Sequence, residues 1–438
     1  MSEVTIEKIV SLSKRRGFIF QNSELYGGLA SSWDYGPLGV ELKKNIKDAW
    51  WRAMVYERDD VFGLDSAILM HPRIWEASGH AQNFADPFLS CSHCDKYYRQ
   101  DNPEIVNGLC PSCGKPLSGE VTYANLMLKT HLGPIEETAL KVFLRPETAQ
   151  GIFVNFANIL AAKHPKLPFG IAQIGKAFRN EITTGNFTFR SREFEQMELE
   201  YFVRPEEDKE YYDFWIQERF NWYIRLGINR DNLRLREHAE DELAHYAKAC
   251  TDIEYHFPFG WMELEGIANR TDFDLRQHSK FSGIELSYFD EQKRDIFFPY
   301  IIEPSGGVDR SLLAFLIDAY REEKVKGEKR VVLGLDKKLA PIKVAVLPLL
   351  SNRSEIVEMA RKIYEDLRAY FVVTYDDTAS IGRLYRRQDE IGTVYCVTVD
   401  VQSLVDKQVT IRDRDTMLQD RISIDKLKEY LDSKFNIG

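Results

Sequence analysis

The sequence lacks any long apolar segment. Its 438 residues contain no run of about 18 apolar side chains, the length that a helix needs to cross a bilayer. The N-terminal segment has a basic cluster at residues 14–16 but no apolar stretch before a small-residue cleavage site, so no secretory signal is predicted. These two absences predict a cytoplasmic protein.

The chain also lacks an excess of positive charge. Its formal net charge of −10 excludes a protein coated in basic surface, so any contact with nucleic acid must use local patches. No internal repeat or low-complexity segment is present. The length predicts roughly two to three domains.

Cysteine is scarce, and most of it falls in one group. Of 6 cysteines, four have the spacing C-x2-C-x15-C-x2-C: Cys91, Cys94, Cys110 and Cys113. This spacing brings two thiolate pairs onto one tetrahedral zinc ion, and four cysteine ligands leave no position for water, so the zinc would be structural. Two disulfides or a redox pair are the alternatives, which a cytoplasmic chain disfavours. Cys250 and Cys396 are predicted to be buried apolar side chains.

A change of composition divides the chain. Residues 321–330 read REEKVKGEKR, and a new pattern begins after residue 340. Strands are predicted at 342–347, 371–375 and 395–399, with helices at 355–370 and 380–390. This alternation predicts a small α/β domain over residues 340–438.

The part before the charged segment, residues 1–335, mixes helical and hairpin patterns. Long helices are predicted at 207–226 and 236–249. The mixture predicts one larger α+β domain, with the cysteine group in an insertion at about residues 87–122.

Residues 170–201 predict two antiparallel strands joined by a turn at 184–186. Alternation places polar side chains on one face of the hairpin: Gln173, Arg179 and Glu181 with Ala177 on the first strand, and Phe194, Gln196 and Glu198 on the second. With Arg190 near the turn, this face offers guanidinium groups for phosphate oxygens and an aromatic ring for a base. A solvated hairpin with surface ion pairs is the alternative.

A glycine-rich segment at residues 303–310 is predicted to follow a strand at 297–302 and to open a helix. The buried stripe of that helix is Leu312, Leu313, Leu316, Ile317 and Tyr320. Glycines in a strand-to-helix turn allow close backbone approach, and Arg310 in the first helical turn suits an anionic ligand. No Gly-Lys-Ser/Thr follows, so this is not a Walker loop, and a capped turn without a ligand is the alternative.

Together these segments resemble the signature motifs of the class II aminoacyl-tRNA synthetases, most closely the homodimeric glycyl-tRNA synthetases. The similar segments are motif 1, the dimerisation element, at about 33–62; a glycine-pocket segment at 145–151; motif 2 at about 170–201; a second glycine-pocket segment at 303–305; motif 3 at about 297–320; and an anticodon-domain segment at 385–393. The resemblance implies an antiparallel-sheet catalytic domain with a zinc-binding insertion and a C-terminal α/β anticodon-binding domain.

The resemblance also implies the reaction and its contacts. The enzyme would activate glycine with ATP to glycyl-adenylate and pyrophosphate, then transfer glycine to the 3′ end of tRNA(Gly). ATP contacts would come from Arg179, Asn180, Glu181, Phe189, Arg190, Arg192, Phe194, Glu263, Leu264, Gly307 and Arg310. Glycine contacts would come from Arg99, Glu147, Gln196, Glu198, Glu303, Ser305 and Gly307.

Within these sets the resemblance implies separate roles. Arg179 would hold the α-phosphate, Phe194 would stack on adenine, and Glu263 would bind Mg²⁺. Arg190 and Arg310 would hold the far phosphates. In-line attack by the glycine carboxylate needs positioning and charge neutralisation rather than a protein nucleophile. A tight pocket excludes larger amino acids, and no segment is long enough for an editing domain.

An arginine stripe in the C-terminal domain is the predicted contact with tRNA. Arg383, Arg386 and Arg387 fall on one face of the helix at 380–390. A solvated face is the alternative. Two rival functions remain: a synthetase for another amino acid, and a non-catalytic nucleic-acid-binding subunit, which the presence of Arg179, Glu263 and Arg310 disfavours.

Overall fold

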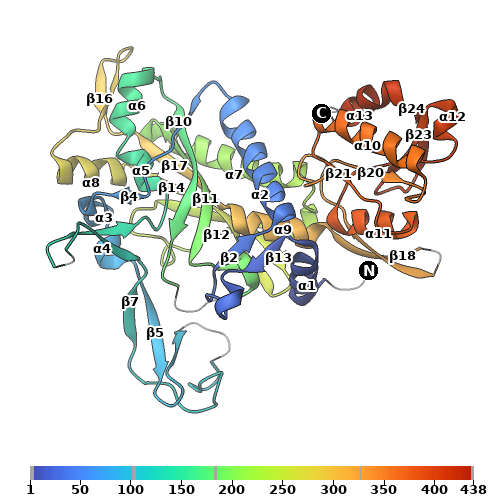
Figure 1. Cartoon of the computed structure of the whole chain (residues 1–438). Coiled ribbons are helices and arrows are strands. Elements are labelled where there is room, and N and C mark those ends of the chain that lie inside the picture. Colours follow the sequence, from blue (N-terminus) through green and yellow to red (C-terminus); the bar gives the residue numbers. More distant parts are fainter. Residues whose placement is uncertain (1–3, 101–104, 136, 182–184, 326, 436–438) are drawn as a thin grey trace.

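A seven-stranded sheet forms the centre of the larger part of the molecule (Figure 1). The computed structural model describes residues 4–100, 105–135, 137–181, 185–325 and 327–435. In sheet order the strands are β12 (Leu233–Glu237), β13 (Ala249–Phe257), β14 (Gly260–Thr271), β17 (Tyr300–Gly307), β11 (Glu193–Val203), β10 (Phe169–Phe178) and β3 (Val61–Gly63). All neighbours pair antiparallel except β3 and β10. This confirms the predicted fold class.

Three helices cover one face of this sheet: α2 (Pro37–Trp51), α7 (Asp208–Arg225) and α9 (Val308–Ala319). The predicted apolar stripe of α9 is buried, and Trp50, Trp215 and Tyr223 lie with it in one core cluster. Burial of these large side chains drives the helices onto the sheet. Helix α7 agrees with the predicted helix at 207–226 to within one residue at each end.

Smaller elements surround the sheet. The helices are α1 (Ile6–Arg16), α3 (Pro72–Ala77), α4 (His80–Asn83), α5 (Ala149–Phe153), α6 (Phe156–Lys163) and α8 (Phe273–Ser282), and a π-helical turn at Arg52–Tyr56 follows α2. The strands are β1 (Ile19–Gln21), β2 (Trp33–Tyr35), β4 (Leu69–Met70), β8 (Lys129–Leu132), β9 (Leu140–Leu144), β15 (Tyr288–Asp290) and β16 (Asp295–Phe297). No helix in the described ranges is long and apolar enough to span a membrane.

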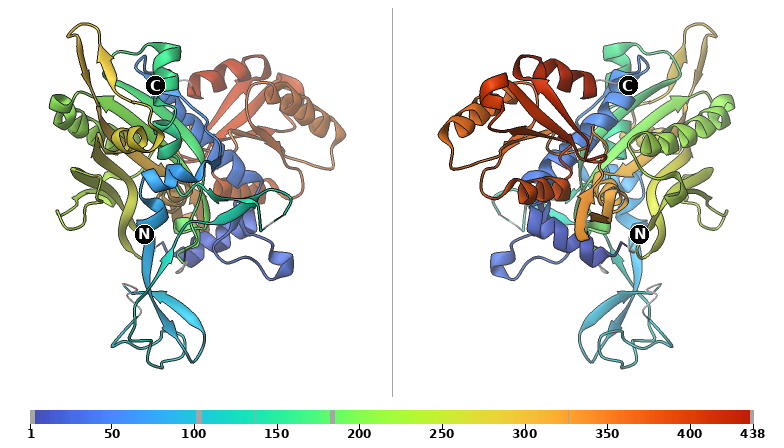
Figure 2. Two further views of the ribbon diagram at one scale, coloured as in Figure 1. Left: turned by 90° about the vertical axis from the view of Figure 1, so that its left-hand side faces the viewer. Right: turned by 90° about the vertical axis from the view of Figure 1, so that its right-hand side faces the viewer.

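The cysteine group lies on an arm that projects from the larger part of the molecule (Figures 1 and 2). Its three-stranded sheet has the order β6 (Lys96–Arg99), β5 (Ala85–Cys91) and β7 (Thr122–Asn125). The arm therefore begins and ends close to the limits predicted for the insertion.

The C-terminal part forms a separate five-stranded sheet beside the larger part (Figure 2). Its order is β21 (Val373–Tyr375), β20 (Val344–Pro348), β22 (Tyr395–Val399), β23 (Gln408–Asp413) and β24 (Gln419–Ser423). The helices are α10 (Ser354–Arg368), α11 (Ile381–Ile391), α12 (Ser403–Asp406) and α13 (Leu427–Phe435). The predicted strand–helix alternation is confirmed through β22, whereas α12, β23, β24 and α13 are additions.

The predicted helix at 236–249 is wrong. Its residues include the end of β12 and the start of β13, with turns between them. Arg234 and Arg236 of β12 pair with Glu254 of β13, so these charges form cross-strand ion pairs. Cross-strand partners decide the conformation of such half-buried segments more than local propensity does.

The charged segment at the predicted domain boundary contributes to β18 (Tyr320–Val325) and β19 (Glu328–Leu333), which pair as a hairpin, and buried Arg330 pairs with Asp389 at 2.8 Å. One further expectation needs correction. The glycine-rich segment is no turn, because residues 303–307 complete β17 and α9 starts directly at Val308. The predicted turn at 184–186 lies partly outside the described residues.

Candidate active site

A cavity of about 320 Å³ opens on the face of the central sheet opposite α7, and the first turn of α9 contributes to its lining. Side chains from β11, β13, β14 and β17 form its floor. The register explains this: Glu198 is opposite Gln173 and Ser305, and Ser305 is opposite Gly266, so these residues share one face. Thirteen predicted site residues line the cavity: Glu147, Arg179, Glu181, Phe189, Arg190, Phe194, Gln196, Glu198, Glu263, Glu303, Ser305, Gly307 and Arg310.

Buried carboxylates gather at one end of the cavity. Glu147 is held at both oxygens, with Oε2 3.2 Å from His80 Nε2 and Oε1 3.0 Å from Gln150 Nε2. Burial opposes its ionisation, but His80, Arg270 and Gln150 outweigh burial and hold the pKa of Glu147 below its ordinary value. Glu147 is therefore an ionised carboxylate in a fixed position.

Glu198 lies next to Glu147 and accepts several hydrogen bonds. Ser305 Oγ donates to Glu198 Oε1 at 2.8 Å, and Thr148 Oγ1 donates to Glu198 Oε2. Burial and the negative charge of Glu147 raise the pKa of Glu198. Ser305 is thus fixed against Glu198, another member of the set predicted to bind glycine.

Glu303 is paired with the buried Arg270, whose Nη1 lies 2.5 Å from Glu303 Oε2. Arg270 also contacts Asp274, with 2.8 Å between Nε and Oδ2. Burial, only partly offset by Arg270, raises the pKa of Glu303 to about 8 with help from the charges of Glu198 and Glu147. The carboxylates at this end outnumber the cations that face them.

Glu200 adds a further carboxylate beneath this group, and the sequence analysis missed it. It is fully buried, and within the described residues neither of its carboxylate oxygens has a hydrogen-bond partner. Burial and the charge of Glu303 raise its pKa well above the ordinary value. Alternation along β11 could have identified it, because Glu200 continues the period of two that Gln196 and Glu198 begin.

The other end of the cavity carries arginines and aromatic rings. The Arg179 guanidinium lies 5.4 Å from the ring centroid of Phe194 and 5.3 Å from that of Phe84. Arg310 lies 4.6 Å from the Phe189 ring and 3.1 Å from a Glu263 oxygen. Arg310 lowers the pKa of Glu263. These groups can bind phosphates, a base and a divalent cation.

Four predicted site residues do not line the cavity. Leu264 is fully buried in the main core cluster. Asn180 and Arg192 lie at a shallower depression beside the arm, where Arg192 donates to the backbone oxygens of Glu181 and Ala30. Arg99 pairs with Asp86 at 2.9 Å on the arm itself. The structure therefore does not bring Arg99 to the other predicted glycine contacts.

The sequence analysis also missed one wall of the cavity. His238, Tyr246, Cys250 and Asp252 line it. His238 and Tyr246 fall in the segment that was predicted to be a helix, and Cys250 and Asp252 alternate on β13 directly after it, where no strand was predicted. The small residues Gly266 and Ala268 leave room in front of this wall, but no sequence motif identified them as cavity residues.

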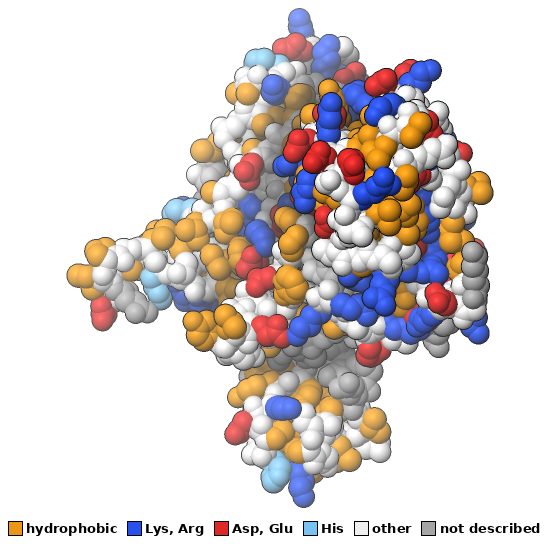
Figure 3. All heavy atoms as spheres, turned by 45° about the vertical axis from the view of Figure 1, so that its right-hand side comes forward, with side chains coloured by type: hydrophobic (Ala, Val, Ile, Leu, Met, Phe, Trp, Pro, Cys, Tyr) orange, Lys and Arg blue, Asp and Glu red, His pale blue; other side chains and the backbone are white. Residues whose placement is uncertain are grey.

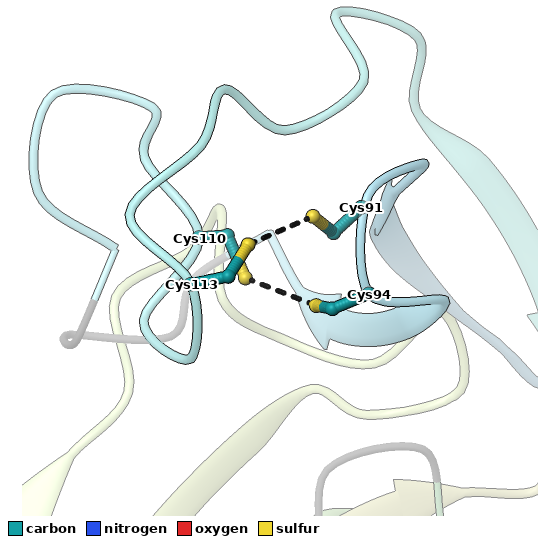
Figure 4. A group of neighbouring side chains, drawn as sticks. All are labelled: Cys91, Cys94, Cys110 and Cys113. Atoms are coloured by element: carbon teal, nitrogen blue, oxygen red, sulfur yellow. Dashed lines mark hydrogen bonds between the residues drawn. The ribbon is translucent and has the colours of Figure 1, made fainter.

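The four arm cysteines come together as the spacing predicts (Figure 4). Their sulfur atoms all lie within 4.8 Å of one another, with 3.5 Å between Cys91 and Cys113 and 3.6 Å between Cys94 and Cys110. Tetrahedral zinc with bonds of about 2.3 Å requires sulfur separations of about 3.8 Å, so the group fits zinc. Desolvation opposes ionisation, but hydrogen bonds involving Tyr98 and backbone amides lower the pKa of Cys110 to about 6, whereas burial and the neighbouring thiols raise the pKa of Cys94 to about 12. The thiolate is therefore favoured at Cys110. All six cysteines are unbridged.

The predicted tRNA contacts lie on α11. Leu384 and Gln388 of this helix are buried, while Arg383 is exposed and Arg386 is half-exposed. Arg387 donates to Asp376 Oδ2 at 3.1 Å and to Thr378 Oγ1 at 2.6 Å. Figure 3 shows Lys and Arg side chains gathered on the lower side of the C-terminal part.

Comparisons with known proteins agree with this arrangement. Residues 135–320 match a family model described as the tRNA synthetase class II core domain (G, H, P, S and T), and residues 343–434 match an anticodon binding domain. A glycine–tRNA ligase of Thermobifida fusca is 54% identical over 449 residues, covering 97% of each chain. A glycine–tRNA ligase of Caldanaerobacter subterraneus is 52% identical over 458 residues, covering 99% of each.

A solved structure shares the fold at low sequence identity. It is a prolyl-tRNA synthetase of Cryptosporidium parvum complexed with L-proline and AMP, with a TM-score of 0.66 and 15% identity. The match covers 98% of this chain and 74% of that chain. This likeness supports the two-part architecture and no finer assignment.

Proposed function

The chain belongs to the glycine–tRNA ligases, class II enzymes that join glycine to tRNA, and we propose that the cavity on its central sheet is where glycine and ATP react. The observation that carries this assignment is the surplus of buried carboxylates at one end of the cavity, beside arginines at the other. The carboxylate end is complementary in charge to the ammonium group of an amino acid, and the arginine end is complementary to the phosphates of a nucleoside triphosphate.

The carboxylate end would hold the ammonium group of glycine. Glu147 is ionised and fixed, and Glu198 and Glu303 supply further acceptors. Ser305 stands against Glu198 and limits the space next to the ammonium, so a side chain on Cα would meet it. Exclusion by bulk rejects alanine and larger amino acids without a separate editing site.

The arginine end would hold ATP. Arg179 would pair with the α-phosphate while Phe194 stacks on the base, and Arg190 and Arg310, which line the same cavity, would hold the outer phosphates. Mg²⁺, held at Glu263, would neutralise phosphate charge when bound. The residues then catalyse glycyl-adenylate formation by placing two anions in line and offsetting their repulsion.

We propose three structural units: a class II catalytic domain at 1–335, a zinc-binding insertion at 87–122 within it, and an anticodon-binding domain at 340–438. Arg383, Arg386 and Arg387 would contact the anticodon arm of tRNA(Gly). The match of residues 343–434 to an anticodon binding domain supports this placement. Because charged tRNA is consumed in translation, the enzyme would act in the cytoplasm.

Two assignments have direct biophysical tests. The arm cysteines would hold one structural Zn²⁺ per chain, and elemental analysis of freshly purified, reduced protein without any metal would contradict this. A homodimer formed through the motif 1 segment at 33–62 would elute at twice the chain mass in light scattering. An active monomer at low concentration would contradict the dimer.

The reaction itself is tested by ATP–pyrophosphate exchange with each of the twenty amino acids. Exchange with glycine alone supports the assignment of the pocket. Exchange with a different amino acid would keep the reaction class and refute the glycine pocket, while silence with all twenty in folded, zinc-loaded protein would refute the catalytic assignment.

A further inference from the structure

A second group of metal-ligating side chains lies in the cavity wall, outside the sets assigned to glycine and ATP. It consists of His238, Cys250 and Asp252. One ligand atom from each lies within 4.8 Å of the other two. The group differs from the arm cysteines because it combines nitrogen, sulfur and oxygen donors.

The sheet holds these three donors in place. Cys250 and Asp252 are two residues apart on β13 and so share a face. His238 follows the last residue of β12, and its backbone N–H donates to the carbonyl of Cys250 at 2.9 Å. Sites built on paired strands keep a more constant geometry than sites on loops.

Space is open in front of the donors. In the register of β13 and β14, Gly266 is opposite Asp252 and Ala268 is opposite Cys250, and both line the cavity. A Cβ atom on Gly266 would stand 3.6 Å from Asp252 Oδ1. The absence of larger side chains at these two positions leaves room for an ion and for a further ligand on the cavity side.

A cation can replace the hydrogen bonds and ion pairs that the three donors now make within the protein. His238 Nε2 lies 2.8 Å from Asp252 Oδ2, so an ion between them would replace one hydrogen bond with two metal bonds. Arg236 Nη2 is 3.4 Å from Asp252 Oδ2, but this guanidinium also pairs with Glu242 at 3.0 Å and Glu254 at 3.1 Å. Arg236 therefore keeps two carboxylate partners if it turns from Asp252.

We propose that His238, Cys250 and Asp252 bind a thiophilic divalent cation of the Zn²⁺ and Cd²⁺ class, and that an ion there obstructs ATP binding. Three protein ligands with one open position are typical of an accessible zinc site. The obstruction rests on the proposed function, because it requires that Glu263, which lines the same cavity, serves ATP. Burial raises the pKa of the Cys250 thiol to about 12, so ion binding releases a proton from it.

The test measures total metal per chain in the full-length protein with its arm loaded with zinc. Cd²⁺ is added, the excess is removed by dialysis, and zinc and cadmium are counted together. Because both metals are counted, replacement of zinc by cadmium in the arm does not change the measured total. The variants are Cys250→Ser and His238→Gln, and the matched control is Cys396→Ser, which removes a lone buried thiol from β22.

Two metal ions per chain are expected in the wild type and in Cys396→Ser, and one in Cys250→Ser and His238→Gln. One ion in every protein, or two in Cys250→Ser, overturns the site. Cd²⁺ is expected to inhibit glycine-dependent pyrophosphate exchange, with a roughly tenfold higher concentration needed in Cys250→Ser. Binding without inhibition overturns the obstruction alone, and failure of exchange in cadmium-free wild type overturns the proposed function instead.

Discussion

The two faces of the central sheet differ in whether their buried carboxylates are paired with cations of the protein. On the covered face, Arg219 of α7 contacts both oxygens of Glu265, at 2.6 and 3.0 Å, and Tyr223 donates to Glu265 at 2.8 Å. On the cavity face, the carboxylates of Glu198, Glu200 and Glu303 lie within 4.8 Å of one another. One face is neutralised within the protein, and the other has more carboxylates than cations.

This difference distinguishes charged residues that stabilise the fold from charged residues that are available to bind a ligand. A buried ion pair with two hydrogen bonds between its partners fixes α7 on β14 and needs no ligand. A buried cluster of like charge is stable only if it takes up protons or binds a cation, and the ammonium of glycine is such a cation. The pKa values of Glu198, Glu200 and Glu303 are raised, as expected for a buried carboxylate cluster that has no bound cation.

The largest expected effect comes from breaking the balanced face. Arg219→Met leaves Glu265 buried without its cation and should lower the free energy of unfolding by about 3–5 kcal/mol. Urea denaturation measures the loss. Replacing both partners, as Arg219→Met with Glu265→Leu, should recover much of it, and a double variant as unstable as the single one would show that the pair is not balanced as described.

The next effect comes from removing one charge from the cavity face. Glu147→Gln keeps the shape but removes the ionised acceptor, so kcat/KM for glycine should fall about 10- to 100-fold while KM for ATP stays within about twofold. Pyrophosphate exchange with each substrate varied in turn measures both. Glu210→Gln, an exposed change on α7, is the control. An equal rise of both KM values would place Glu147 outside the glycine pocket.

A pH dependence should distinguish the two faces without a large structural change. Glu303, with its pKa raised to about 8, keeps a proton in the folded chain that the unfolded chain loses near pH 4.5. Stability of the glycine-free protein should therefore fall as pH rises between these values, by at most about 1.4 kcal/mol per unit for this group. Glycine affinity should rise over the same window, because binding an ammonium favours the ionised carboxylate.

Calorimetry across pH checks both trends, with Glu303→Gln as the comparison. The variant lacks the titrating group, so its stability should vary less between about pH 4.5 and about pH 8. Identical profiles in the two proteins would assign the proton to a different carboxylate of the cluster.

The smallest expected effect is at Glu200. Because its raised pKa keeps it neutral, Glu200→Gln mimics the folded form and removes the need to take up a proton on folding. Stability near pH 4.5, where the unfolded carboxyl is itself about half protonated, should change by less than about 1 kcal/mol, in the stabilising direction. Thermal unfolding measures this change. A large loss would mean that Glu200 is ionised and paired, which would make the cavity face more balanced than described.

The sequence predicted the site best where local periodicity and tertiary contacts agree. Gln196 and Glu198 follow from alternation on a strand that is half of one hairpin, and the register confirms their common face. His238 was missed because a charged segment with helical spacing became parts of two paired strands and the turns between them, and Asp252 was missed because β13, which begins at the end of that segment, was not predicted. Arg99 was predicted as a glycine contact from resemblance alone. In the structure it lies on the arm and forms an ion pair with Asp86.

By itself the sequence determined the cysteine group, the central hairpin, the apolar stripe of α9 and the family. These depend on spacing over a few residues or on long motifs, and both can be read along the chain. Only the tertiary structure decided which buried carboxylates receive a cation from the protein. Glu265 meets Arg219 from α7 while Glu200 meets no donor among the described residues, because the packing of distant segments sets the charge on each face.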